Sequence, residues 1–167
     1  RDACYDAVTD ALAREGVVHM RGALATEDRR YIDGVFEREI QPLLSPAIVD
    51  ARHPFPHVPS KQLYIAVRLE QNGQEESLFG LIPIPPALER VVFLPGEEPH
   101  RYVLVENIIA GRTAAVFPMY RVLESAVFCV TRNADIKADA ELYTQDADYR
   151  EYMKEVLKKR RRMAPVR

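Results

Sequence analysis

The sequence predicts an α+β domain in which a mixed, largely antiparallel sheet is flanked by helices. Two patterns predict it: apolar residues recur every second position in the middle of the chain, as in strands, and at helical spacing near both ends. The third observation is composition, because 167 residues with 47% hydrophobic and 29% charged side chains suit one ordinary domain with its own core. We therefore treat residues 1–167 as a single domain.

Two helices are predicted before the sheet. Residues 2–15 place their apolar side chains on one helical face, and Gly16 provides a stop. Over residues 26–41 a second apolar stripe recurs at helical spacing, with Thr26 as the expected N-cap and Pro42 ending the helix. The two stripes consist of Cys4, Val8, Ala11 and Leu12, and of Ile32, Val35, Phe36 and Ile40. The proline-rich residues 42–59 then predict an extended loop.

Apolar alternation and turn signals predict the strands. Asn72 and Gly73 are expected to turn the first strand back into an antiparallel partner. Residues 121–131 are β-branched and nearly uncharged, which predicts a central strand. The other predicted strands are residues 63–69, 78–82, 90–94 and 101–105. Residues 108–116 predict a short helix, and a C-terminal helix has an apolar face of Tyr149, Tyr152, Met153, Val156 and Leu157.

Nothing in the sequence predicts a membrane span or a secretory signal. Uncharged stretches such as residues 77–88 are broken by glycine and proline and fall short of the roughly 20 apolar residues that a span needs. The N-terminal residues are too charged for a secretory signal. Cys4 and Cys129 lie far apart within apolar patterns, which predicts two buried free thiols in a reducing compartment. We therefore expect a cytoplasmic protein.

Charge is divided unevenly along the chain. The net charge is −2, yet residues 154–167 hold seven Lys or Arg and one Glu, so the preceding residues are acidic overall. The chain also begins at Arg1 rather than Met, and it stops at Val166 and Arg167 just where a new extended segment would begin. These features predict a piece of a longer protein, so the lack of a catalytic apparatus here says little about the parent.

The loop around Phe55 is a candidate metal site that the residue pattern does not favour. His53 and His57 could present two imidazoles, but a metal site needs three or four ligands, and the intervening prolines prevent a helix. We expect instead a structural loop in which Phe55 fills the core. Cys129 is expected to be buried rather than nucleophilic, because its neighbours are apolar. No glycine-rich phosphate loop occurs, and no catalytic, cofactor-binding or metal residue is assigned.

The most conspicuous charge cluster is the basic run Lys158, Lys159, Arg160, Arg161 and Arg162. A polyanion such as polyphosphate or RNA would bind such a run by releasing counterions. Cations at a helix C-terminus are also stabilised by the helix dipole, and the interleaved aromatic residues that stack on single strands are missing. A solvated helix end is favoured over polyanion contact. Arg132, close to Asn133 and Asp135, is likewise expected in a salt-bridged turn rather than at a ligand.

Several segments together resemble a known family. In order along the chain they read "FEREIQPLLSPAIVD", "HPFPHVP", "VLVENIIAG", "VFPMYRVLESAVFCVTRNADI" and "LKKRRRMAPVR". Over about residues 10–167 they resemble the middle (head) domain of the type 1 polyphosphate kinases. The resemblance implies a fold like that of the phosphohistidine phosphatases, with residues 1–24 as a remnant of a preceding helical domain. Cys129 replaces an arginine of many members, which puts details of subunit contact in doubt.

The resemblance implies a parent enzyme that makes polyphosphate reversibly from ATP, with magnesium, through a phosphorylated histidine in its carboxyl-terminal domains. None of His19, His53, His57 and His100 matches that histidine. The implied role of this fragment is a non-catalytic scaffold, inactive alone, that contacts other domains of its chain and forms homo-oligomers. The implied structural or interface residues are Pro54, Phe55, Pro56, Thr131, Arg132 and Asp135. The parent is expected in the cytoplasm, including at the membrane periphery.

Two alternatives stay open. The first is a binding module that takes polyphosphate or RNA on the basic C-terminal helix. The second is a free-standing phosphohistidine phosphatase, which rests on fold analogy alone and needs a histidine beside an anion pocket.

Overall fold

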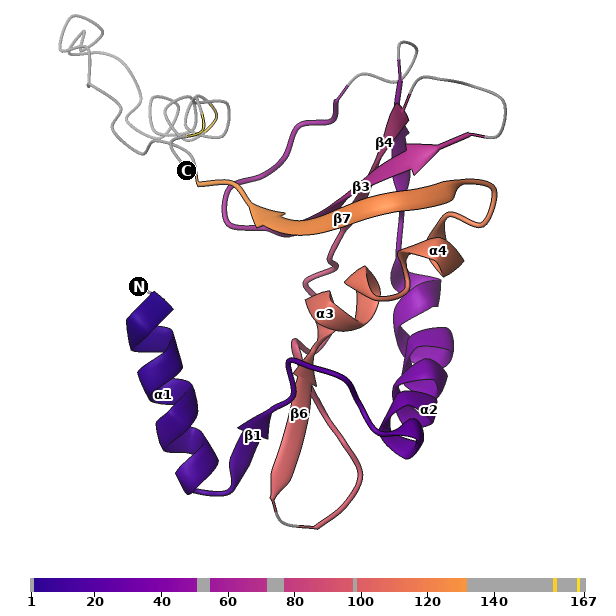
Figure 1. Ribbon diagram of the computed structural model, residues 1–167. Coiled ribbons are helices and arrows are strands. Elements are labelled where there is room, and N and C mark those ends of the chain that lie inside the picture. The colour runs from indigo at the N-terminus through magenta and orange to yellow at the C-terminus, as the bar shows by residue number, and fades with distance from the viewer. Residues whose placement is uncertain are drawn as a thin grey trace, which may run out of the picture.

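The computed structural model describes residues 2–50, 55–71, 77–97 and 99–131, together with positions 158 and 165 (Figure 1). Within these residues the chain forms an α+β fold of two small sheets with helices between and beside them, as the sequence predicts for the fold class. The helical elements are α1 (Asp2–Arg14), α2 (Thr26–Val35), the π-helical η1 (Phe36–Ile40), the 3₁₀ turn η2 (Gln41–Leu43), α3 (Val105–Ala110) and α4 (Thr113–Val116). The strands are β1 (Val17–His19), β2 (Ala47–Val49), β3 (Leu63–Glu70), β4 (Ser77–Pro83), β5 (Val91–Phe93), β6 (His100–Leu104) and β7 (Arg121–Cys129).

The larger sheet is antiparallel and has the order β2-β4-β3-β7. The pairing of β3 with β4 confirms the predicted hairpin partner, because Ile65 lies opposite Ile82 and Val67 opposite Gly80. Among the described strands β7 lies at the edge of this sheet, so the prediction of a central strand was wrong for this part of the chain. An uncharged run of residues indicates apolar faces, whereas a central position depends on hydrogen bonding along both strand edges. Within the described part of the chain, β7 pairs with β3 alone.

The smaller sheet has the order β1-β6-β5 and combines one parallel and one antiparallel pair. The strands predicted at 90–94 and 101–105 therefore form, but they belong to a second sheet rather than to the first. β1 joins β6 in parallel with Val18 opposite Arg101, an association between segments far apart in sequence. Figure 1 shows α3 between the two sheets, directly after β6.

The core lies where α2, η1, α3 and the inner face of the larger sheet meet. Its buried side chains include the predicted stripe of the second helix, which is confirmed, and the alternate residues of β3. These residues are Ile32, Val35, Phe36 and Ile40 with Ile65, Val67 and Leu69, joined by Ile82, Val103, Val105, Ile108, Ile109 and Phe117. The two sheets thus share one hydrophobic cluster, and α3 supplies its centre.

Helix boundaries differ from the sequence prediction in three places. Ala25, not Thr26, occupies the N-cap of α2, and no side chain caps the helix there. The α-helical part ends at Val35, and the chain continues through η1 and η2, which includes Pro42, before it becomes extended at Leu44. The helix predicted over 108–116 is two short helices interrupted at Gly111 and Arg112, since glycine weakens a helix interior. Gly16 follows α1 with a φ of 80°, as its predicted role as a stop requires.

Three expectations about burial were also wrong. Phe55 is 59% exposed, and it is Val58 of the same loop that is buried, at 3%. Cys4 and Cys129 are free, but both are exposed, because α1 is open to solvent on most sides and β7 is an edge strand. The predicted turn at residues 72–73 and the apolar face over 149–157 lie outside the described residues.

Candidate functional site

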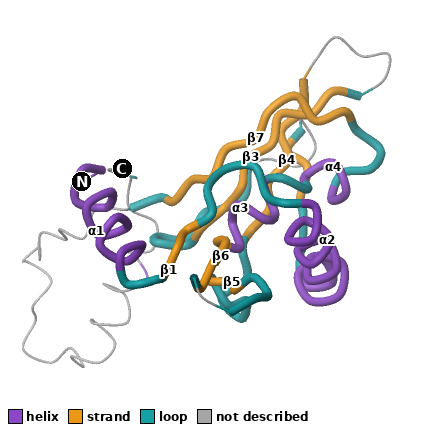
Figure 2. Tube along the Cα trace, turned by 60° about the horizontal axis from the view of Figure 1, so that its bottom comes forward, coloured by secondary structure: helices purple, strands orange, loops and turns teal. Residues whose placement is uncertain are grey.

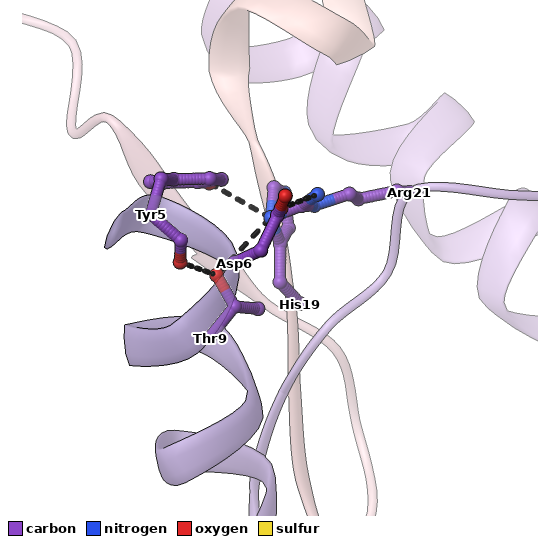
Figure 3. Close-up of polar contacts among 5 residues, drawn as sticks. All are labelled: Tyr5, Asp6, Thr9, His19 and Arg21. Atoms are coloured by element: carbon purple, nitrogen blue, oxygen red, sulfur yellow. Dashed lines mark hydrogen bonds and ion pairs between the residues drawn. The ribbon is translucent and has the colours of Figure 1, made fainter. Parts of the chain in front are cut away.

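The densest polar cluster joins α1 to the start of the smaller sheet, and Figure 3 shows its five side chains. Tyr5 and Thr9 lie one turn apart on α1, and Asp6 is next to Tyr5. His19 ends β1, and Arg21 follows two residues later. Residues four apart share a helix face and residues two apart share a side of an extended chain, so local geometry places the side chains of each set together.

Arg21 is the hub of this cluster. Its Nε donates to His19 Nδ1 at 3.2 Å, Nη1 to Asp6 Oδ1 at 3.3 Å, and Nη2 to Thr9 Oγ1 at 3.1 Å. The guanidinium carbon also lies 4.6 Å from the centre of the Tyr5 ring, in cation-π contact. The Thr9 hydroxyl in turn donates to the Tyr5 carbonyl oxygen at 2.8 Å. Each nitrogen of Arg21 is therefore engaged by a protein partner.

Arg21 also fixes the proton on His19. A guanidinium can only donate hydrogen bonds, so His19 Nδ1 must carry a lone pair and the neutral ring has its hydrogen on Nε2. The hydroxyl of Tyr5 lies 3.2 Å from the same Nδ1. Burial, followed by the positive charge of Arg21, lowers the pKa of His19, while the Glu106 carboxylate opposes this shift. The ring stacks on Tyr102 with its centre 4.8 Å away and the planes 4° apart.

A second ion pair, with a buried carboxylate and an exposed guanidinium, acts on this ring. Glu106 lies in the first turn of α3 with a side chain that is only 6% exposed, and its Oε1 accepts from Arg90 Nε at 2.9 Å and Nη2 at 2.6 Å. The other oxygen of Glu106, Oε2, and Nε2 of His19 are buried without a hydrogen-bond partner among the described residues. One is an acceptor and the other a donor.

Beside the cluster is a cavity of about 550 Å³ with two guanidinium groups in its wall. Arg21 is engaged as described, and Arg112 donates to Asp33 Oδ1 through Nε at 2.9 Å and Nη2 at 2.5 Å, and to the Ile108 carbonyl through Nη1 at 3.2 Å. Phosphoryl-transfer sites hold cations ready for the phosphate oxygens. Here both guanidinium groups are neutralised by carboxylates.

The predicted site residues are scattered where the structure describes them. Lys158 is exposed and helical, and Phe55 and Pro56 are exposed in the loop before β3. Thr131, just after β7, is partly buried. The remaining ones, Lys159, Arg160, Arg161, Arg162, Pro54, Arg132 and Asp135, lie outside the described residues. A polyanion site on the basic run therefore stays a prediction.

The described residues contain neither a metal-ligand cluster nor a helix that could span a membrane. No group of three or more His, Cys, Asp or Glu side chains in this part of the chain could hold a metal ion. His57 and His100 are exposed and His53 is outside the described residues. Every described helix is too short or too polar to pass through a bilayer.

Sequence reasoning missed the cluster around Arg21. The segment 17–20 is too short to be assigned as a strand, and its partner β6 is about 80 residues away. A signal was present, since Tyr5 with Thr9, and His19 with Arg21, have the spacings that share a face. What the spacing could not give is that the two faces meet.

Comparison with known proteins decides the family. Residues 27–167 match the family model described as the polyphosphate kinase middle domain. The chain belongs to the polyphosphate kinase family. This confirms the resemblance drawn from the sequence blocks, which include the segments of η1, α3 and β7.

Relatives of the polyphosphate kinase middle domain come from several bacteria. A polyphosphate kinase of Bacillus anthracis is 35% identical over 166 residues, which cover 96% of this chain and 23% of the relative. One of Streptomyces coelicolor is 36% identical over 139 residues, or 82% of this chain and 18% of the relative. The chain thus spans about a fifth of the length of the relatives it matches.

The fold is also found in a solved structure. The crystal structure of a polyphosphate kinase from Porphyromonas gingivalis superimposes with a TM-score of 0.70 at 30% identity, covering 81% of this chain and 22% of that one. The predicted α+β class is confirmed, while the implied similarity to phosphohistidine phosphatases stays a prediction.

Proposed function

We propose that these residues are a non-catalytic scaffold and subunit-contact domain of a polyphosphate kinase. The full enzyme would reversibly transfer the terminal phosphate of ATP, with magnesium, to inorganic polyphosphate through a phosphorylated histidine outside this chain. Its partners would be the other domains of the same protein and a second subunit, in the cytoplasm. The family membership of residues 27–167 supports this proposal.

The observation that supports the scaffold role is that arginine side chains form ion pairs with carboxylates within the domain. In the described part of the chain, six of them form ion pairs with carboxylates of other segments. The pairs are Arg21–Asp6, Arg68–Glu124, Arg90–Glu106, Arg101–Asp28, Arg112–Asp33 and Arg121–Glu70. A guanidinium that neutralises a carboxylate stabilises a junction and is a poor stabiliser of a transferring phosphoryl group.

We also infer that residues 1–24 belong to a preceding helical domain. The family match begins at residue 27, directly after the start of α2. α1 contributes no residue to the hydrophobic core cluster, whereas α2 provides a whole stripe. Figure 2 shows α1 and α2 on opposite sides of the molecule.

The expected result for the isolated 167-residue chain is no formation of polyphosphate from ATP and no formation of ATP from polyphosphate. The full-length protein that contains it should catalyse both directions in a luminescent ATP assay. In the full-length protein, Arg101→Met in this domain should lower the fraction of folded, active enzyme. The apparent kcat should therefore fall, while the KM for ATP should stay unchanged. Turnover by the isolated chain, or a full-length protein without activity, would refute the proposal.

A further inference from the structure

We propose that α1 is held against the smaller sheet by a latch whose acceptor is the uncharged ring of His19, and that protonating this ring releases the helix. The latch consists of Tyr5, Asp6, Thr9, His19 and Arg21 (Figure 3). It is a conformational device within this chain and is independent of the proposed function.

Apolar packing contributes little to the position of α1. Its large apolar side chains are open to solvent, with Val8 53% and Leu12 39% exposed, and none of them enters the core cluster. The helix packs mainly beside β1, at the edge of the molecule (Figures 1 and 2). The polar contacts through Arg21 are therefore the main connection, and exposed ion pairs of this kind are individually weak. A latch made of such contacts can be opened by the change of a single charge.

The connection passes through one acceptor atom. Arg21 holds Asp6 and Thr9 of α1 with its two terminal nitrogens while its Nε is anchored on His19 Nδ1. A second proton on the ring would occupy Nδ1. The Tyr5 hydroxyl can then reverse its role and accept, but Arg21 has no lone pair with which to do so. Protonation therefore turns a hydrogen bond into a contact between two cations, and Arg21 must move away with the α1 side chains that it holds.

The charged and titratable groups around the ring set the direction of this response. Tyr5 and Asp6 face it from α1, and Arg21 from its own segment. Tyr102 stacks on it from β6.

From α3, Glu106 favours the charged ring, although Arg90 already binds this carboxylate. Burial and the charge of Arg21 outweigh the effect of Glu106, so the pKa of His19 in the latched state is lower than its ordinary 6.5. The latch is then fully formed above pH 6.5 and opens as the pH falls through the lowered pKa.

Hydrogen exchange of the 167-residue chain tests the latch. Protection of the α1 amides, corrected for intrinsic exchange rates, should fall several-fold between pH 7.5 and pH 5. The amides of α2, followed in the same sample, should show no matching change. Unchanged protection of α1 across this range would overturn the proposal.

Two substitutions at the same position separate the latch from general unfolding. In His19→Asn the side-chain oxygen takes the place of Nδ1, so α1 should stay protected at both pH values. In His19→Gln the amide lies near the place of Nε2, so α1 should lose protection at both. If His19→Gln fails to fold, as judged by its α2 amides, Arg21→Gln provides the same open state. A pH response of His19→Asn equal to that of the wild type would also overturn the proposal.

Discussion

Replacing Arg101 by methionine is expected to lower the free energy of unfolding by about 3 kcal/mol, because it leaves a buried carboxylate unpaired. Asp28 lies in the first turn of α2 with a side chain that is 5% exposed, and it accepts from Arg101 Nη1 at 2.5 Å. The same guanidinium donates to the Pro95 carbonyl oxygen at 3.0 Å. Arg101 therefore joins α2 to β6 and to the loop before it, two parts that are far apart in sequence.

Urea unfolding monitored by circular dichroism measures this loss. The matched control is Arg68→Met, which breaks an ion pair with Glu124 in which both side chains are well exposed, and it should cost less than about 1 kcal/mol. The double variant Asp28→Asn with Arg101→Met should recover part of the stability, since it removes the stranded charge. Equal losses for Arg101→Met and Arg68→Met would show that burial of Asp28 does not matter.

The elements that were predictable from the sequence are those that depend on local patterns. The two-residue period of β3 and the helical stripe from Ile32 to Ile40 both report a buried face, and both faces are in the core. The β3–β4 pairing followed because the two strands are neighbours along the chain. Where an element is long enough to show a pattern and its partner follows directly along the chain, both its buried face and its partner can be predicted from local sequence.

The errors concern contacts between distant segments. β1 has three residues, too few for a pattern, and its parallel partner β6 is reached only after the whole larger hairpin. The apolar composition of β7 shows what its faces prefer, but its edge position follows from the order of all strands. Phe55 and the two cysteines were judged from neighbouring residues, while their exposure depends on what covers them in space.

The ion pairs of α2 also join segments that are distant in sequence. Asp28 with Arg101 and Asp33 with Arg112 both link α2 to segments more than 70 residues later. α2 is thus fixed by its apolar stripe to the core and by two carboxylates to the chain around β6 and α3. No residue type or spacing in α2 predicts which arginine each carboxylate will meet.

Gly80→Ala is the second substitution expected to have a large effect, with a loss of about 2 kcal/mol in the free energy of unfolding from overpacking. A Cβ atom at residue 80 of β4 would lie 2.6 Å from Phe117 Cζ and 3.0 Å from Leu69 Cδ1. Phe117 is 5% exposed and belongs to the core cluster, so its ring cannot swing aside into solvent. Because Gly80 has no side chain, the ring of Phe117 can pack directly against the larger sheet.

The matched control for this prediction is Gly22→Ala, where a Cβ would meet nothing within 4 Å, and it should change stability by less than about 0.5 kcal/mol. Shortening the ring partner tests the mechanism directly, because Phe117→Leu should cost less in the Gly80→Ala background than in the wild type. Additive losses in this double-variant cycle, measured by urea unfolding, would mean that the two residues do not compete for space. A favourable coupling would show that one missing side chain in β4 determines how the helical layer packs on the sheet.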